Sequence, residues 1–74
     1  MKYVKTENPK HYRINLERTL FYYPYEYNGS FYIKFKVAGT DVQWTFKNSE
    51  ERDSILLQLD YASASQNIQT IVSL

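Results

Sequence analysis

Residues 20–37, LFYYPYEYNGSFYIKFKV, decide how this chain folds, because they read as two strands joined by a tight turn. The dipeptide Asn28-Gly29 at the centre is the strongest short hairpin signal, since a type I′ turn needs positive φ at both central residues. A two-residue turn pairs Tyr27 with Ser30 and fixes every pair behind it. The sequence therefore predicts an antiparallel hairpin of defined register.

This register divides the side chains of the hairpin between two faces, because successive residues of a strand point to opposite sides. One face receives aromatic rings and lysines, namely Phe21, Tyr23, Tyr25, Tyr27, Tyr32, Lys34 and Lys36. The other face receives a more apolar set, namely Leu20, Tyr22, Phe31, Ile33, Phe35 and Val37. A single helix can cover only one of these faces.

The segment before the hairpin extends its first strand. Residues 12–17 alternate between apolar and polar side chains, and the alternation slips at Arg18, which predicts a bend or bulge at that point. Pro24 suits an edge strand, since its missing N–H would point away from the second strand. We therefore expect the strand order 1-2-3, with the first strand at an edge.

The segment after the hairpin predicts a third strand. A turn at residues 38–41 leads into a stretch in which every second residue from Val42 onward is apolar. Pairing Val37 with Val42 places Trp44 beside Phe35, on the face opposite the tyrosines. The sequence therefore predicts that Trp44 is buried in the core.

A helix is predicted next. Asn48 can cap it, and Glu51, three residues later, completes a capping-box pattern. The apolar positions of this helix form one stripe, made by Ile55, Leu56, Leu59 and Ala62. The fold class is then α+β, a three-stranded antiparallel meander followed by one helix packed on one face. The last residues, IQTIVSL, either add a short fourth strand or extend as a tail.

A chain of 74 residues has room for one domain. Residues 1–10 are polar, charged and interrupted by Pro9, so we expect a loosely held N-terminal arm, with residues 11–74 forming a single small α+β domain. Apolar burial in so short a chain only just offsets the entropy of ordering it. Because the chain has no cysteine, self-association or a tight partner is left as the added stabiliser.

Catalytic, metal and cofactor sites are not signalled by the residue pattern. His11 is the only histidine, and we expect an ordinary surface residue, so neither a zinc site nor a catalytic triad is predicted. The carboxylates are explained by turns and by the helix, and the two glycines belong to turns rather than to a phosphate-binding loop. We expect a protein that is not an enzyme and that binds no cofactor or metal.

The composition also bears on location and partners. The first residues contain no apolar run, and no stretch approaches the length that spans a bilayer. Together with the absence of cysteine, this predicts a cytoplasmic protein with no membrane partner. A net charge of +1 gives no bulk attraction to nucleic acid.

The face of tyrosines and lysines is the candidate partner-binding site, because a contiguous group of exposed rings is unusual. Its predicted residues are Phe21, Tyr23, Tyr25, Tyr27, Tyr32, Lys34, Lys36 and Lys47. Three interpretations stay open: rings that merely pack across strands at the surface, recognition of another protein or a second copy, and stacking on a nucleotide or single-stranded nucleic acid. The small positive charge of the face and of the whole chain favours a protein partner over a nucleic acid.

In its small size, its lack of catalytic residues and its aromatic face, the chain is similar to small phage or mobile-element proteins that block a host enzyme or sequester a signalling nucleotide. This similarity implies an inhibitor of a host protein that acts by stoichiometric binding. It rests on analogy between whole molecules, because no motif carries it.

Overall fold

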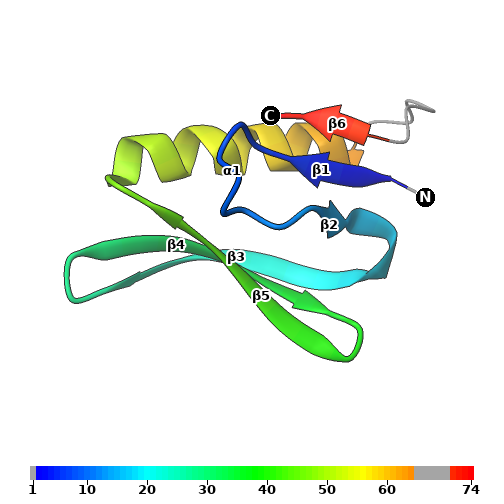
Figure 1. Cartoon of the computed structure of the whole chain (residues 1–74), viewed down its shortest axis with the longest axis horizontal. Helices are drawn as coiled ribbons and strands as arrows, with labels where there is room; N and C mark the ends of the chain where they lie inside the picture. Colours follow the sequence, from blue (N-terminus) through cyan, green and yellow to red (C-terminus); the bar gives the residue numbers. More distant parts are fainter. Residues whose placement is uncertain (1, 65–70) are drawn as a thin grey trace.

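The computed structural model describes residues 2–64 and 71–74, which form two small sheets and one helix (Figure 1). The elements are β1 (Tyr3–Lys5), β2 (Ile14–Asn15), a 3-10 turn (Leu16–Arg18), β3 (Thr19–Tyr27), β4 (Ser30–Val37), β5 (Thr40–Phe46), α1 (Ser49–Ala64) and β6 (Ile71–Ser73). The larger sheet has the order β3-β4-β5, and the helix packs on one of its faces. The α+β class and the three-stranded antiparallel meander are therefore confirmed.

The first hairpin has the predicted register. Asn28 and Gly29 form its turn with φ values of 51° and 75°, and Tyr27 pairs with Ser30. β3 lies at an edge of the sheet, as Pro24 indicates. The turn chemistry and the alternation of side chains therefore agree over the whole β3–β4 ladder down to Phe21.

The second hairpin has a different register from the predicted one. Its turn has two residues instead of four, with Gly39 at a φ of 87°, so Val37 pairs with Thr40 and not with Val42. Trp44 consequently lies opposite Ile33. Because the shift is two residues and side chains alternate with a period of two, the apolar face of β5 still points to the core.

The predicted position of Leu20 is wrong. We expected it on the apolar face of the hairpin, but Thr19 pairs with Val37 and the register shifts between Thr19 and Phe21. The irregularity predicted at Arg18 occurs as the 3-10 turn. The register shift after Thr19 is a second irregularity, which was not predicted. Leu20 falls within the bulge, where it is unpaired and exposed to solvent.

The N-terminal segment is the largest departure from expectation. Instead of a loosely held arm, Tyr3–Lys5 form β1, the middle strand of a second sheet with the order β2-β1-β6. β2 runs antiparallel to β1 and β6 runs parallel to it. Val4 is fully buried, because this sheet closes the core beside α1. The C-terminal strand that we left open is present at Ile71–Ser73, and residues 67–70 lie outside the described part of the chain.

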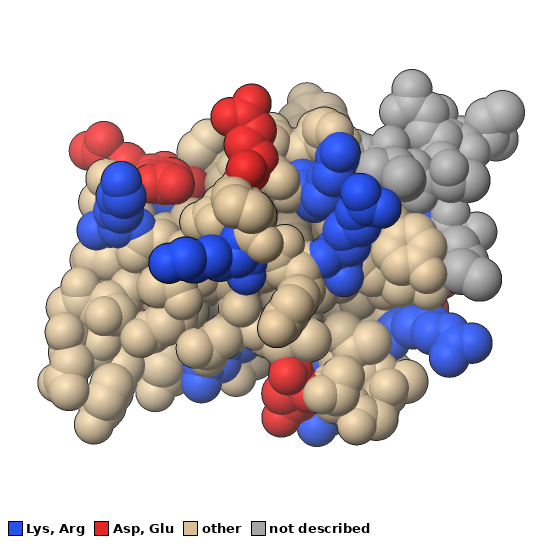
Figure 2. Space-filling model, in the orientation of Figure 1, with Lys and Arg blue, Asp and Glu red and all other residues tan. Residues whose placement is uncertain are grey.

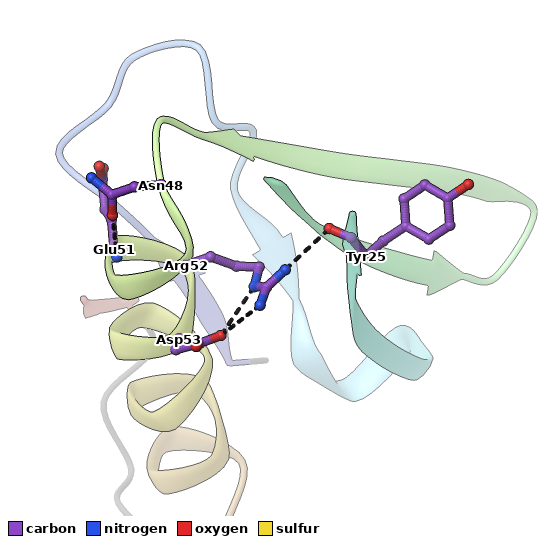
Figure 3. Close-up of polar contacts among 5 residues, drawn as sticks. All are labelled: Tyr25, Asn48, Glu51, Arg52 and Asp53. Carbon is purple, nitrogen blue, oxygen red and sulfur yellow. Dashed lines mark hydrogen bonds and ion pairs between the residues drawn. The ribbon is translucent and has the colours of Figure 1, made fainter. Parts of the chain in front are cut away.

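The helix begins as predicted. The Glu51 N–H donates to the Asn48 side-chain oxygen at 2.8 Å, which satisfies one of the free N–H groups of the first turn (Figure 3). Leu59 and Ala62 of the stripe are buried, and Ile55 and Leu56 pack against the core. The start and the buried side of the helix are thus confirmed.

Arg52 ties the helix to the sheet. Its side chain is only 14% exposed, and its guanidinium donates to the Tyr25 carbonyl oxygen at 3.3 Å and pairs with Asp53 at 2.9 Å (Figure 3). It also lies 5.5 Å from the centroid of the Phe31 ring. The one basic side chain of the helix is therefore turned toward the sheet, and its charge is partly neutralised there.

Trp44 is the centre of the core and is fully buried, as predicted. Its indole N–H donates to the Tyr12 carbonyl oxygen at 2.8 Å, and its ring packs edge-on against Phe35 with 4.7 Å between centroids. The other buried apolar side chains are Val4, Ile14, Ile33, Phe35, Phe46, Leu59 and Ala62.

His11 is a second correction, because it is buried rather than on the surface. Its ring stacks on Trp44 at 5.3 Å between centroids and 8° between planes. Nε2 lies 2.8 Å from the Thr45 carbonyl oxygen, which can only accept, so Nε2 carries the proton. Nδ1 then accepts from the Thr6 hydroxyl at 2.7 Å. Both ring nitrogens are satisfied, so this histidine is a structural residue that joins the N-terminal segment to β5.

Tyr22 forms a second link between the sheet and the helix, and it predicts a pH dependence. Its hydroxyl donates to Asp60 at 2.6 Å. Burial, followed by this hydrogen bond and by the negative charge of Asp60, raises the pKa of Tyr22 from 10.0 to about 12. The folded protein therefore keeps a proton that the unfolded chain loses near pH 10.

We expect the stabilisation from this pair to be complete below pH 10 and to be lost as the pH rises toward 12. The Tyr22→Phe variant should lose less free energy of unfolding over that interval than the parent does, as measured by urea denaturation. Tyr12→Phe, which removes an exposed hydroxyl, is the control. Equal losses in the parent and the Tyr22→Phe variant would contradict the proposed role of the pair.

Candidate binding face on the larger sheet

The side of the larger sheet that points away from α1 carries the predicted binding residues. The tyrosine face is defined here as Phe21, Tyr23, Tyr25, Tyr27, Tyr32, Lys34 and Lys36. In Figure 1, α1 and the strands of the second sheet lie above the larger sheet, and no described element lies below it. The pairing of β3 with β4 brings all seven residues together, and it follows from the Asn28-Gly29 turn.

The rings of this face are accessible to different degrees. Tyr27, Phe21 and Tyr23 are 62%, 55% and 41% exposed, whereas Tyr25 and Tyr32 are half-buried. Tyr25 lies opposite Tyr32 with 6.1 Å between ring centroids, and Phe21 lies 6.0 Å from Tyr23. The half-buried pair supports the sheet, and the three outer rings offer contact area.

The lysines of the face have different surroundings. Lys36 forms an ion pair with Asp41 at 2.9 Å. The Lys34 ammonium lies 3.9 Å from the centroid of the Tyr25 ring and has no carboxylate partner within the described residues. Lys47 follows the last paired residue of β5, so the ladder does not place it on the face. Lys34 is therefore the cation that a partner would meet.

Strand β5 adds polar residues that the sequence analysis missed. Asp41, Gln43 and Thr45 pair with Lys36, Lys34 and Tyr32 and so lie on the same face. Asp41 was missed because it was assigned to a four-residue turn, whereas Gln43 and Thr45 lie on this face in either register and were passed over because they are neither aromatic nor charged. A two-residue turn closed by Gly39 would have placed Asp41 opposite Lys36, and the resulting charge pair is the signal that could have found it.

The face is hollowed near the β4–β5 turn. An open depression of about 440 Å³ lies between the three strands. Six side chains of the face line it: Phe21 and Tyr23 from β3, Lys34 and Lys36 from β4, and Asp41 and Gln43 from β5. Such a hollow can receive an apolar side chain of a partner, and it can surround a carboxylate with the two lysines.

Charge is distributed unevenly over the molecule. In Figure 2, the lower left of the view, over the β3–β4 hairpin, is almost free of charged side chains, whereas acidic and basic side chains lie together at the upper left, over the start of α1. Among residues 2–64 and 71–74, no three His, Cys, Asp or Glu side chains are grouped so that they could hold a metal ion. The one helix described there is too short and too polar to cross a membrane.

Comparison with known proteins finds no matching family model, no matching curated protein and no matching solved structure. The interpretation of the tyrosine face therefore depends on its own geometry and chemistry.

Proposed function

We propose that this protein is a non-enzymatic binding protein that holds another protein chain through the tyrosine face. The observation that carries the proposal is the contiguous group of exposed rings on a sheet face that no other described element covers. Single exposed rings are ordinary, but a contiguous group marks an interaction site. Tyrosine suits such a site, since it offers a large rigid ring with a hydrogen-bonding tip.

The charges of the face support a protein partner over a nucleic acid. Affinity for nucleic acid comes largely from cations that neutralise phosphates. Lys36 is already paired with Asp41, which leaves Lys34 as the one unpaired cation of the tyrosine face. One such cation is a small contribution to phosphate binding.

Binding of a nucleotide or a single strand is the second candidate. It is favoured by the depression of about 440 Å³ beside Phe21 and Tyr23, a volume within the ordinary range of small-ligand sites, with Lys34 at its lining. Salt separates the two functions, because binding to phosphates falls steeply with ionic strength and an aromatic protein interface changes little.

By analogy with small phage and mobile-element proteins, we further propose that binding blocks the activity of a host protein in the cytoplasm. The support is the same combination that suggested it, a small chain with a candidate binding face and without a signalled catalytic site. In such a mechanism the inhibitor covers a surface of its target and acts at a ratio of one to one.

The test uses the variant Phe21→Ala, Tyr23→Ala, Tyr27→Ala, which removes the three most exposed rings of the face. Affinity for a purified partner that the parent captures, identified by mass spectrometry, should fall at least about tenfold, since hot-spot side chains each contribute more than about 1 kcal/mol. The matched control is Tyr12→Ala, an exposed ring that lies outside the face. A folded triple variant with undiminished affinity would show that the face is not the binding site.

A further inference from the structure

The outward side of α1 is unusual for a solvent-exposed helix surface. Opposite the buried stripe lie Leu57 and Tyr61, one helical turn apart and 62% and 77% exposed. Glu50 and Asp53 lie on the same side at helical spacing, and Asp60 flanks it. This side of the helix, called the helix ridge here, therefore combines two large apolar side chains with acids.

The helix ridge carries no basic side chain. Arg52 is the only cation of α1, and it is turned toward the sheet, where it contacts the Tyr25 carbonyl oxygen and Asp53. Glu50 consequently faces solvent without a basic neighbour on its own element, whereas Asp53 pairs with Arg52 and Asp60 accepts the hydrogen bond from Tyr22. The ridge therefore presents the negative charge of Glu50 beside the exposed apolar side chains Leu57 and Tyr61.

The helix ridge and the tyrosine face are complementary. The tyrosine face presents rings, the depression and the unpaired Lys34, whereas the ridge presents Leu57 and Tyr61 among acids. Their lengths also agree. The 16 residues of α1 span about 24 Å, and strands of 7 to 9 residues span about 23 to 30 Å. The two surfaces lie on opposite sides of the molecule, so they can meet only between two copies.

We propose that the tyrosine face binds the helix ridge of a second copy of this chain. This inference rests on the proposed function and names a second copy, in place of a host protein, as the partner of the tyrosine face. Leu57 or Tyr61 of one copy enters the depression of the next, and Glu50 of the ridge approaches Lys34, the unpaired cation of the face. Because the two contact surfaces differ, the contact is head-to-tail and leaves one free surface at each end, so copies add in a row.

A symmetric dimer through two tyrosine faces is less favourable. It would bring the unpaired Lys34 of both copies into one interface, where like charges oppose association. It would also leave Leu57 and Tyr61 uncovered. The head-to-tail contact places opposite charges together and covers both apolar surfaces at once.

The experiment uses two variants with one defective surface each. The face variant is Phe21→Ala, Tyr23→Ala, Tyr27→Ala, and the ridge variant is Leu57→Ser, Tyr61→Ser, all at exposed positions. The weight-average mass of the parent should rise between about 10 µM and about 1 mM protein in sedimentation or light scattering, the range of weak specific association. Each variant alone should stay a monomer, and an equimolar mixture should form a 1:1 heterodimer and nothing larger.

The heterodimer is the decisive result, because the face variant keeps an intact ridge and the ridge variant keeps an intact face. A parent that stays monomeric at about 1 mM, a ridge variant that associates like the parent, or a mixture without heterodimer would each overturn the proposal. If the ridge variant associates normally while the face variant loses an unrelated partner, this inference fails and the proposed function stands.

A charge variant gives a second readout that does not depend on apolar packing. Glu50→Lys changes an exposed side chain in the first turn of the helix and should weaken the association about three- to tenfold. Circular dichroism should confirm that every variant is folded. An unchanged association of a folded Glu50→Lys variant, together with an absent heterodimer, would exclude the head-to-tail contact.

Discussion

Replacing Trp44 with alanine is expected to unfold most of the protein. The side chain is fully buried, stacks on His11, meets Phe35 edge-on and donates its indole N–H to Tyr12. Truncating a buried tryptophan costs about 3 to 5 kcal/mol. A single core in so short a chain rarely supplies more than about that amount, so little folded protein should remain.

The measurement is urea denaturation followed by circular dichroism, with Tyr12→Ala as the control because its ring is exposed. In the parent, the emission of the single tryptophan should be blue-shifted and resistant to iodide quenching. A Trp44→Ala variant that unfolds cooperatively at the urea midpoint of the parent would show that this residue does not hold the core together.

Replacing Val4 with aspartate is expected to be at least as damaging. Val4 is fully buried in the middle strand of the second sheet. A carboxylate at this position would lose its hydration and would gain no ion-pair partner in exchange. Burying an unpaired charge costs several kcal/mol. The fold should therefore be lost, although the change lies in the fourth residue of the chain.

Tyr12→Asp is the matched control for Val4→Asp, because it introduces the same charge at an exposed position. Thermal unfolding of the two variants, followed by circular dichroism, compares them directly. If Val4→Asp melts at the temperature of the control, residues 3–5 are dispensable and an N-terminal arm would be the better description.

The parts of the fold that the sequence predicted depend on local signals. Asn28-Gly29 specified a turn, the alternation behind it specified faces, and Asn48 specified the start of a helix. These signals were enough to assemble the seven residues of the tyrosine face and to bury Trp44.

The parts that could not be predicted depend on distant contacts. β1 has three residues and one fully buried side chain, which is too short a segment for a periodic signal. His11 is buried because Trp44 and Thr45, more than thirty positions away, meet its ring. Leu20 is exposed because a bulge, invisible in the alternation, shifts it out of the ladder.

The parallel pairing of β1 with β6 has a consequence for the order of folding. Tyr3 and Ile71 are partners although 68 positions separate them along the chain, whereas the β3–β4–β5 ladders join neighbours through turns of two residues. Loop-closure entropy has to be overcome before a non-local pair gains stability, and chains rich in such pairs fold more slowly. We therefore expect the meander to form early in folding and the second sheet to form last, when the two ends of the chain meet.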